Sequence, residues 1–258
     1  MKIFVCVKPV PDTAAKIKVG ADGKHIDPSG VKYELGNYDS RAVARAVALK
    51  EASGGELVVV SAGNAGKGES EARKRLKDVL ALGADKGLLI PDEAYENRDP
   101  LAVAKALAAA IQAQGGFDLV ITGRQAVDDQ ALSVGPMLAT LLGVPCVTDV
   151  VGLEVQDGKA QVRRAAEGRT ELLEVTLPAV ITAQRDLAEE KYPKLKEILK
   201  ANKKPVEEFA FSWPEAAYEV TALSPPPEPQ AGKIVGQGPD AVPELLRLLQ
   251  EEAKALTL

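Results

Sequence analysis

DLVITGRQAVDDQALSVG, residues 118–135, is the stretch of sequence on which the expected fold depends. Leu119–Thr122 is a short, apolar, β-branched run that predicts a buried strand, and Gly123 ends it. Apolar residues then recur at helical spacing over 132–142, which predicts a helix. Ligands of open α/β sheets bind beyond the carboxyl ends of the strands, so the residues between this strand and this helix are a candidate ligand-binding loop.

This loop carries groups that suit a nucleotide. Free N–H groups at the start of a helix attract an anion, and Gly123 lets the backbone approach a ligand closely. Arg124 would add a positive charge, and Gln125 can bind a base edge or a ribose hydroxyl. Asp128 and Asp129 disfavour a bare phosphate beside them and suit hydroxyl groups. One of them can instead be the N-cap of the helix, and the sequence leaves both interpretations open.

Strands and helices alternate outward from this stretch. The strands are apolar runs, and the helices show apolar residues three and four positions apart. This pattern predicts an α/β fold, a mostly parallel twisted sheet with helices on both faces, as in Rossmann-like adenine-nucleotide-binding domains. We expect strands at 2–7, 57–60, 87–90, 119–122 and 144–151, and helices at 39–52, 70–82, 100–114 and 132–142.

Turn signals add antiparallel pieces to this sheet. Pro9–Pro11 is expected to end the first strand, and Asp22-Gly23 predicts a short hairpin after it. Asp157-Gly158 predicts a second hairpin, where the pattern of the chain changes. Runs at 171–175 and 177–182 then predict strands that lead back to the main sheet.

The C-terminal part differs in composition. Residues 205–238 are rich in proline without a clear period, which predicts an extended arm that builds no core. Residues 240–256 predict an amphipathic helix with Pro243 in its first turn. Its apolar face can pack on a partner subunit or on the chain's own sheet. We expect two domains, a nucleotide-binding domain over 1–205 and a partner-contacting arm and helix over 206–258.

Composition disfavours several classes of function. The net charge of −5 gives no electrostatic footprint for nucleic acid, and no apolar run is long enough to span a membrane. Cys6 and Cys146 lie in apolar runs and are expected to be buried thiols of a reducing compartment. With no cleavable leader in the sequence, we expect a cytoplasmic protein. The single histidine, His25, lies in a polar turn, which disfavours a histidine base or a metal site.

Motifs of other nucleotide-binding and catalytic folds are not matched. SAGNAGKGES, residues 61–70, lacks the glycine spacing of a phosphate-binding Walker loop and the Ser or Thr after its lysine. No GxSxG or CxxC motif occurs, and no GxGxxG follows the first strand. Ala62, Gly63 and Asn64 can still lie close to a phosphate or a base. We therefore expect a binding protein without catalytic residues of its own, not an enzyme.

Motifs spread over nearly the whole chain, in the same order, resemble the β subunit of electron transfer flavoprotein. The resemblance rests on VKPVPD at 7–12, GRQAVDDQALSVG at 123–135, VRRAAEGRTELLEVTLPAVITAQ at 162–184, YPKLKEILKANKKP at 192–205 and PPEPQAG at 226–232.

The resemblance implies a heterodimer with an α subunit, one FAD at the interface bound mostly by α, and a structural AMP held by this chain. Thr13 and Tyr38 would approach the flavin. The turn Gly36-Asn37-Tyr38 departs from the Asn-Pro-Phe common in the family. Carried over by position, the AMP contacts would be Cys6, Asn37, Tyr38, Asp39, Ala62, Gly123, Arg124, Gln125, Ala126, Val127, Asp128, Asp129, Gln130, Ala131, Leu132, Ser133 and Val134.

The resemblance also assigns residues 184–204 as a recognition loop. Leu195 would enter an apolar pocket of an acyl-CoA dehydrogenase-type partner, with Lys191 and Tyr192 beside it. From the residues alone, Leu195 can instead be a core contact of a short helix. Two departures from the family are LAEEKY at 187–192, where LNEPRY is common, and Pro229, which stands where the family often has an arginine that contacts the partner.

The function implied is that of an electron carrier subunit. It would carry electrons from acyl-CoA and related dehydrogenases of fatty acid oxidation to a respiratory, quinone oxidoreductase-type acceptor. An alternative within the family is an electron-bifurcating subunit with a second FAD in the AMP pocket. An alternative from another class is a stand-alone adenine-nucleotide-binding protein of the stress-protein type.

Overall fold

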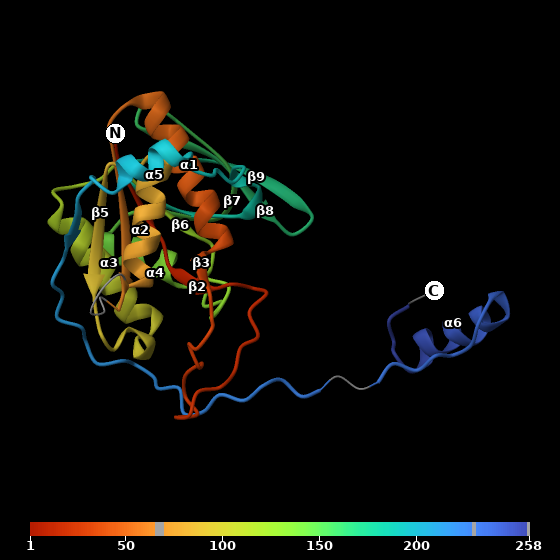
Figure 1. Ribbon diagram of the computed structural model, residues 1–258. Helices are drawn as coiled ribbons and strands as arrows, with labels where there is room; N and C mark the ends of the chain where they lie inside the picture. The colour runs from red at the N-terminus through yellow and green to blue at the C-terminus, as the bar shows by residue number, and fades with distance from the viewer. Residues whose placement is uncertain (65–69, 229–230, 257–258) are drawn as a thin grey trace. The chain divides into compact units, whose positions relative to one another are not determined.

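The computed structural model describes residues 1–64, 70–228 and 231–256, and it divides into two units, Met1–Leu223 and Ser224–Leu258. The described part of the first unit holds a nine-stranded sheet in the order β11-β5-β4-β1-β6-β10-β7-β8-β9 (Figure 1). The strands are β1 (Lys2–Cys6), β4 (Glu56–Gly63), β5 (Lys86–Pro91), β6 (Leu119–Gly123), β7 (Cys146–Gln156), β8 (Lys159–Ala166), β9 (Arg169–Thr176), β10 (Ala179–Ala183) and β11 (Val206–Glu208).

The strands from β11 through β7 run parallel, and β8 and β9 extend the sheet with antiparallel pairing. The turn between β7 and β8 uses Asp157 and Gly158, with φ of 52° and 76°. Two consecutive positive φ angles are the backbone of a two-residue hairpin turn whose twist matches that of its strands. The predicted second hairpin is therefore confirmed, and so is the return to the main sheet, because β10 pairs with both β6 and β7.

Helices cover both faces of the parallel sheet, as the apolar strands predict. Alternate residues of each strand point to opposite faces, so Val5 of β1 packs with one helix pair and Phe4 with the other. On the first face lie α1 (Asn37–Ser53) and α2 (Glu71–Leu82), and on the second lie α3 (Pro100–Ala113) and α4 (Val134–Leu142). The side chain of Ser70 caps α2 and that of Asp99 caps α3, which explains where these helices begin.

The segment after β1 is more ordered than its prolines predict. Pro9–Pro11 forms strand β2, which pairs antiparallel with β3 (Tyr33–Leu35) in a separate small sheet. Proline is tolerated in β2 because each strand of a two-stranded sheet is an edge strand. Val19 and Ile26 form an antiparallel bridge around Asp22-Gly23, which confirms the first predicted hairpin.

The expectation that 205–238 builds no core is wrong for its first part. Strand β11 pairs in parallel with β5 at the edge of the main sheet. Phe209, Phe211 and Trp213 then pack against the core on the α3 side of the sheet. These aromatic residues alternate along the chain with period two, which is a strand-like pattern that the proline content of the region obscured.

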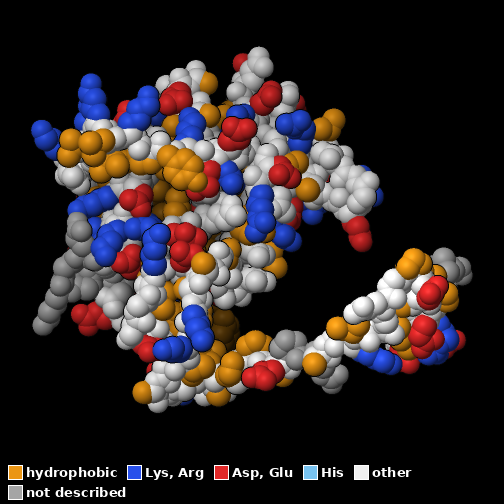
Figure 2. Space-filling view, turned by 45° about the vertical axis from the view of Figure 1, so that its right-hand side comes forward, with side chains coloured by type: hydrophobic (Ala, Val, Ile, Leu, Met, Phe, Trp, Pro, Cys, Tyr) orange, Lys and Arg blue, Asp and Glu red, His pale blue; other side chains and the backbone are white. Residues whose placement is uncertain are grey.

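The second unit contains α6 (Val242–Glu251), which is amphipathic as predicted. Of its apolar residues, Leu248 is buried, whereas Val242, Leu245 and Leu246 are exposed. Figure 2 shows hydrophobic side chains at the surface of this unit beside its charged ones. The packing of this apolar face on a partner subunit stays a prediction, and so does the domain boundary at 205. Pro229 lies outside the described residues.

Among the residues that the structure describes, no helix is long and apolar enough to cross a bilayer.

We predict that Trp213→Ala lowers the free energy of unfolding by about 2 kcal/mol, because the indole ring docks the segment after β11. Its Nε1–H donates to the Pro91 carbonyl (3.3 Å) and its ring packs edge-on against Phe211. Because Trp213 is the only tryptophan, urea unfolding should be followed by circular dichroism rather than fluorescence. The control is Tyr218→Ala, an exposed aromatic residue whose removal should change little. Equal effects of the two substitutions would contradict the docking.

Candidate functional site

A cleft of about 1860 Å³ lies at the carboxyl ends of the parallel strands of the first unit. Cys6 ends β1, Gly123 ends β6, Ala62 lies one residue before the end of β4, and all three line the cleft. This is the end of an open α/β sheet at which ligands bind. The volume exceeds the roughly 300–1,000 Å³ usual for a small-molecule pocket, so the cleft is an open groove with room for more than a mononucleotide.

The carboxylate of Asp39 ties the strand ends beneath the cleft together. Asp39 lies in the first turn of α1 and is buried. One carboxylate oxygen accepts the N–H of Lys8 (2.8 Å), which follows β1, and the other accepts the N–H of Gly123 (3.1 Å). Burial raises the pKa of Asp39 to about 7, although these two hydrogen bonds oppose the increase. A single side chain therefore fixes α1, β1 and β6 relative to one another.

Glycine is required at position 123 by this contact. A Cβ built on Gly123 would overlap Oδ1 of Asp39 and would lie 3.0 Å from Cβ of Tyr38. The first turn of α1 can approach the end of β6 only because no side chain is present there.

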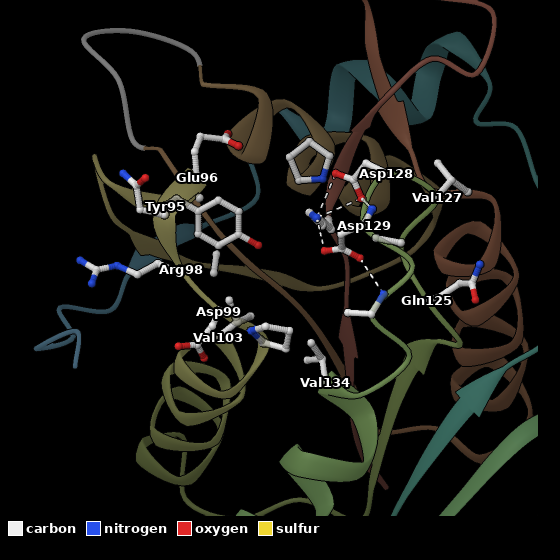
Figure 3. Close-up of a pocket in the computed structure, with 18 of the residues that line it drawn as sticks. Tyr95, Glu96, Arg98, Asp99, Val103, Gln125, Val127, Asp128, Asp129 and Val134 are labelled. Carbon is white, nitrogen blue, oxygen red and sulfur yellow. Dashed lines mark hydrogen bonds and ion pairs between the residues drawn. The ribbon is translucent and has the colours of Figure 1, made fainter. Parts of the chain in front are cut away.

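Lys8 connects the end of β1 to the loop after β6. Its Nζ lies 2.9 Å from Asp128 Oδ2 and 2.8 Å from Asp129 Oδ2 (Figure 3). Burial by itself lowers the pKa of Lys8, but Tyr95, Asp128 and Asp129 raise it, and the net change is upward. Lys8 therefore remains protonated and acts as the counter-ion of both carboxylates.

The interpretation of Asp128 or Asp129 as an N-cap is wrong. Helix α4 begins at Val134 with Ser133 as its N-cap, and the loop reaches it through Gln130 and Leu132, which have φ of 50° and 59°. The aspartates turn toward Lys8 because an ion pair is available there. The predicted helical pattern accordingly fails at Leu132, which is exposed and lies outside α4.

The first turn of α4 lies at the cleft, and the N–H groups of Val134 and Gly135 have no partner within the helix. Ser133, Val134 and Gly135 line the cleft, and the Ser133 side chain makes no capping hydrogen bond. A Cβ on Gly135 would lie 2.6 Å from Thr182 Cγ2 and 3.1 Å from Thr122 Oγ1, so glycine lets the helix start rest on β6 and β10. An uncapped helix start in a cleft is a suitable place for an anion.

Arg124 also lines the cleft, but its charge is already engaged. Its Nε lies 2.6 Å from Asp149 Oδ1, and its backbone N–H donates to the Ala183 carbonyl (3.0 Å). The expected role of Arg124 as a free counter-charge is therefore limited by Asp149, a residue of β7 that sequence reasoning did not identify.

The structure brings most of the predicted nucleotide contacts and one predicted flavin contact to this cleft. Asn37 and Gln130 are exposed and are not among its described lining residues. Tyr38 is buried instead, with the Arg185 guanidinium 5.5 Å from its ring. The predicted residues that line the cleft are Cys6, Thr13, Asp39, Ala62, Gly123, Arg124, Gln125, Ala126, Val127, Asp128, Asp129, Ala131, Leu132, Ser133 and Val134.

Two further residues of the site were not predicted. Lys8 belongs to the VKPVPD motif, whose position directly after a strand could have suggested it. Tyr95 lies in a short 3-10 helix (Tyr95–Asn97), and its ring faces the pair of Lys8 and Asp129 (Figure 3). Burial raises the pKa of Tyr95 to about 12, so its hydroxyl stays neutral. No sequence pattern marks Tyr95, because it reaches the site only through the fold.

The predicted recognition loop presents its apolar residues to solvent. Leu195 begins α5 (Leu195–Ala201) and is 73% exposed, and Tyr192 is 80% exposed. Ile198 and Leu199 are also exposed, so the interpretation of Leu195 as a core contact is wrong. Within α5, the residue that joins the core is Ala201, at the C-terminal end of the helix.

Residues on both sides of α5 make polar contacts with α1 and α2. Nζ of Lys204 donates to the carbonyls of Leu80 (2.8 Å) and Ala84 (2.6 Å), at the C-terminal end of α2. A cation at this end also interacts favourably with the helix dipole. Lys191, before the helix, lies 3.6 Å from Glu51 of α1. The exposed apolar residues therefore lie on a helix whose flanking lysines contact α1 and the end of α2.

We predict that Asp39→Asn lowers the free energy of unfolding by about 2 kcal/mol, since an amide accepts only one of the two N–H groups and opposes the other with its own donor. The effect should depend on pH. The pKa of Asp39 is raised above its value of about 4 in the unfolded chain, so its contribution to stability falls as pH rises from about 4 to about 7.

Urea unfolding of parent and variant at about pH 5 and pH 8 measures this change. The parent should exceed the variant in stability by more at the lower pH. A difference that is the same at both values would contradict the raised pKa.

Comparison with known proteins finds relatives over nearly the whole chain. The "Electron transfer flavoprotein subunit beta" of Bacillus subtilis (strain 168) is 35% identical and covers 99% of this chain and 100% of its own. The protein of the same description from Bradyrhizobium diazoefficiens is 37% identical, with coverage of 99% and 100%. The "Caffeyl-CoA reductase-Etf complex subunit CarD" of Acetobacterium woodii is 34% identical, with coverage of 80% and 77%.

A family model described as "Electron transfer flavoprotein domain" matches residues 24–213, which include the loop after β6 and helix α5. The family model and the relatives agree with the mostly parallel α/β fold, and the chain belongs to the electron transfer flavoprotein β subunit family.

Proposed function

We propose that this chain is the β subunit of a heterodimeric electron transfer flavoprotein, in which it binds AMP in the cleft and shares one FAD with an α subunit. The observation that carries the proposal is the uncapped start of α4, which opens into a large cleft at the strand ends. Family membership supports the same conclusion, because relatives of this description cover the whole chain.

The cleft has the groups that an AMP phosphate requires. The N–H groups of Val134 and Gly135 in the first turn of α4 would hold it, since the third residue of the turn, Pro136, has no N–H. Gly135 allows this turn to lie close against β6 and β10. Arg124, although paired with Asp149, adds positive charge at the same rim.

The nucleoside would occupy the remaining part of this region. The carboxylates of Asp128 and Asp129 can accept ribose hydroxyls while they stay paired with Lys8. Cys6, Leu107 and Val134 supply apolar lining for a base. Burial strongly raises the pKa of the Cys6 thiol, so it is a neutral contact rather than a nucleophile.

FAD, when bound, would supply the electron chemistry, since it can take up and release electrons. The contribution of this chain would be to hold it and exclude water. Thr13 lines the outer part of the cleft and would lie toward the flavin. Tyr38 would need to contact it from outside the cleft, beside Arg185. We propose no acid, base or nucleophile in this chain, whose role is that of a carrier.

Helix α5 and the residues before it would dock redox partners. One exposed leucine that becomes buried contributes roughly 1.5–3 kcal/mol, which supports brief binding to an acyl-CoA dehydrogenase-type donor. Tyr192 and Leu195 are the most exposed apolar side chains of this loop, with Lys191 beside them. Dissociation after each transfer would free the carrier for a quinone oxidoreductase-type acceptor. The apolar face of α6 would pack on the α subunit, and the cytoplasm is the proposed location.

A second candidate is the bifurcating type, in which FAD replaces AMP. The cleft volume admits a dinucleotide, and one relative is described as a subunit of a caffeyl-CoA reductase-Etf complex. The third possibility, a stand-alone stress-type protein, is disfavoured by the family match, and a flavin-free homodimer that binds ATP would be needed to support it.

Acid extraction of the purified heterodimer, followed by chromatography, should yield one FAD and one AMP. AMP should be lost with Gly135→Ala, because the added methyl group displaces the start of α4 from the strands. The control is Gly143→Asn, at the other end of α4, where no atom lies near an added Cβ and asparagine tolerates the left-handed backbone (φ 70°). Two flavins per heterodimer without AMP would instead establish the bifurcating type.

Leu195→Ala should reduce electron transfer from a dehydrogenase donor by at least about tenfold, with FAD content and fold unchanged. A coupled dye-reduction assay measures the rate, and the absorbance spectrum measures the flavin. Leu172→Ala is the matched control, because Leu172 is a leucine of β9 with a similar exposure of 78%. Equal turnover of Leu195→Ala and the parent would refute the docking role.

A further inference from the structure

Lys8 joins the strand ends beneath the cleft to the loop after β6, through its backbone N–H and its side-chain ammonium. Its backbone N–H donates to Asp39, which fixes the strand ends, and its Nζ contacts Asp128 and Asp129 in the loop after β6. The side chain is largely shielded, with 24% of its surface exposed. Tyr95 lies close enough to interact electrostatically with the Lys8 ammonium, whose pKa it raises. Lys8 is therefore an internal link rather than a surface charge.

The loop that Lys8 holds has an unfavourable backbone. Gln130 and Leu132 both adopt the left-handed conformation, which residues other than glycine rarely occupy. Hydrogen bonds within the loop, from Asp129 N–H to Asp128 and from Ala131 N–H to Asp129, depend on the same two carboxylates. Positioning these carboxylates therefore positions the whole path into α4.

Electrostatics gives Lys8 a second role. Asp128 and Asp129 lie a few residues before the start of α4, where the proposed phosphate would bind. Two unpaired carboxylates would repel that phosphate and offset the attraction of the helix start. The other cations that line the described cleft have acidic partners elsewhere, and these pairs are Lys24 with Glu219, Arg98 with Asp92 and Arg124 with Asp149.

We propose that Lys8 is the positioning residue of the nucleotide loop, which it holds in its strained form while it neutralises the two carboxylates beside the phosphate position. The inference rests on the proposed function, because it concerns AMP binding at the start of α4. It assigns Lys8 no contact with the nucleotide. The lysine acts through Asp128 and Asp129.

The test is titration of AMP into the heterodimer from which nucleotide has been removed, with the binding heat as the readout. Lys8→Met should weaken AMP binding by at least about tenfold. Its affinity should recover in part as salt is raised from about 20 mM to about 500 mM, since salt screens the exposed repulsion. Lys8→Arg, which keeps the charge, should bind AMP nearly as the parent does.

Combining Lys8→Met with Asp128→Asn and Asp129→Asn distinguishes an effect of Lys8 through the two carboxylates from a direct contact of Lys8 with AMP. The triple variant lacks the repulsion and keeps groups that accept hydroxyls, so it should bind AMP more tightly than Lys8→Met. Lys86→Met is the matched control, because Lys86 of β5 is as shielded as Lys8 and pairs with Glu207 (2.6 Å) but is not among the described residues that line the cleft, and it should leave AMP affinity unchanged. Hydrogen exchange over 124–133 should be faster in Lys8→Met than in the parent.

Parent-like AMP affinity of Lys8→Met would overturn the inference, and so would a triple variant that binds no better than Lys8→Met. If Lys8→Met does not fold, Lys8→Gln provides the same comparison with a polar, uncharged side chain. Failure of the parent itself to bind AMP would overturn the proposed function instead, so the two failures are distinguishable.

Discussion

The buried carboxylate of Asp39 is the constraint on which the rest of the site depends. Its two oxygens accept N–H groups from the residues that follow β1 and end β6, so one side chain sets the spacing of a helix and two strands. The space for it exists only because residue 123 is glycine. Burying a carboxylate is unfavourable, as its raised pKa shows, and the two hydrogen bonds offset part of that cost.

The loop after β6, which lies next to these strand ends, carries both charged residues and an unfavourable backbone conformation. The loop after β6 passes through two left-handed residues and carries two adjacent carboxylates, and Lys8 balances both. The thiol of Cys6 and the phenol of Tyr95 both have raised pKa values, so each stays protonated. The exposed apolar residues of α5 are not among the described residues that line the cleft.

Much of the fold could be predicted from periodicity. Apolar runs identified the parallel strands, and Asp157-Gly158 identified a hairpin whose positive φ angles the structure confirms. The segment after Pro205 was misjudged because proline content outweighed the period-two aromatic residues Phe209, Phe211 and Trp213, which contribute to the core. The loop after β6 was located correctly, but the partners of its aspartates were not, since a lysine more than a hundred residues away competes with a local helix cap.

The sequence by itself determined the fold class and the place, at a strand end, of the loop between β6 and α4, because these depend on local composition and on regular spacing. Only the tertiary structure decided that Lys8 pairs with Asp128 and Asp129, that Arg124 pairs with Asp149, and that Tyr38 is buried away from the cleft lining. The physical reason is that ion pairs and burial depend on distances between strands far apart in sequence, and those distances exist only once the sheet has formed.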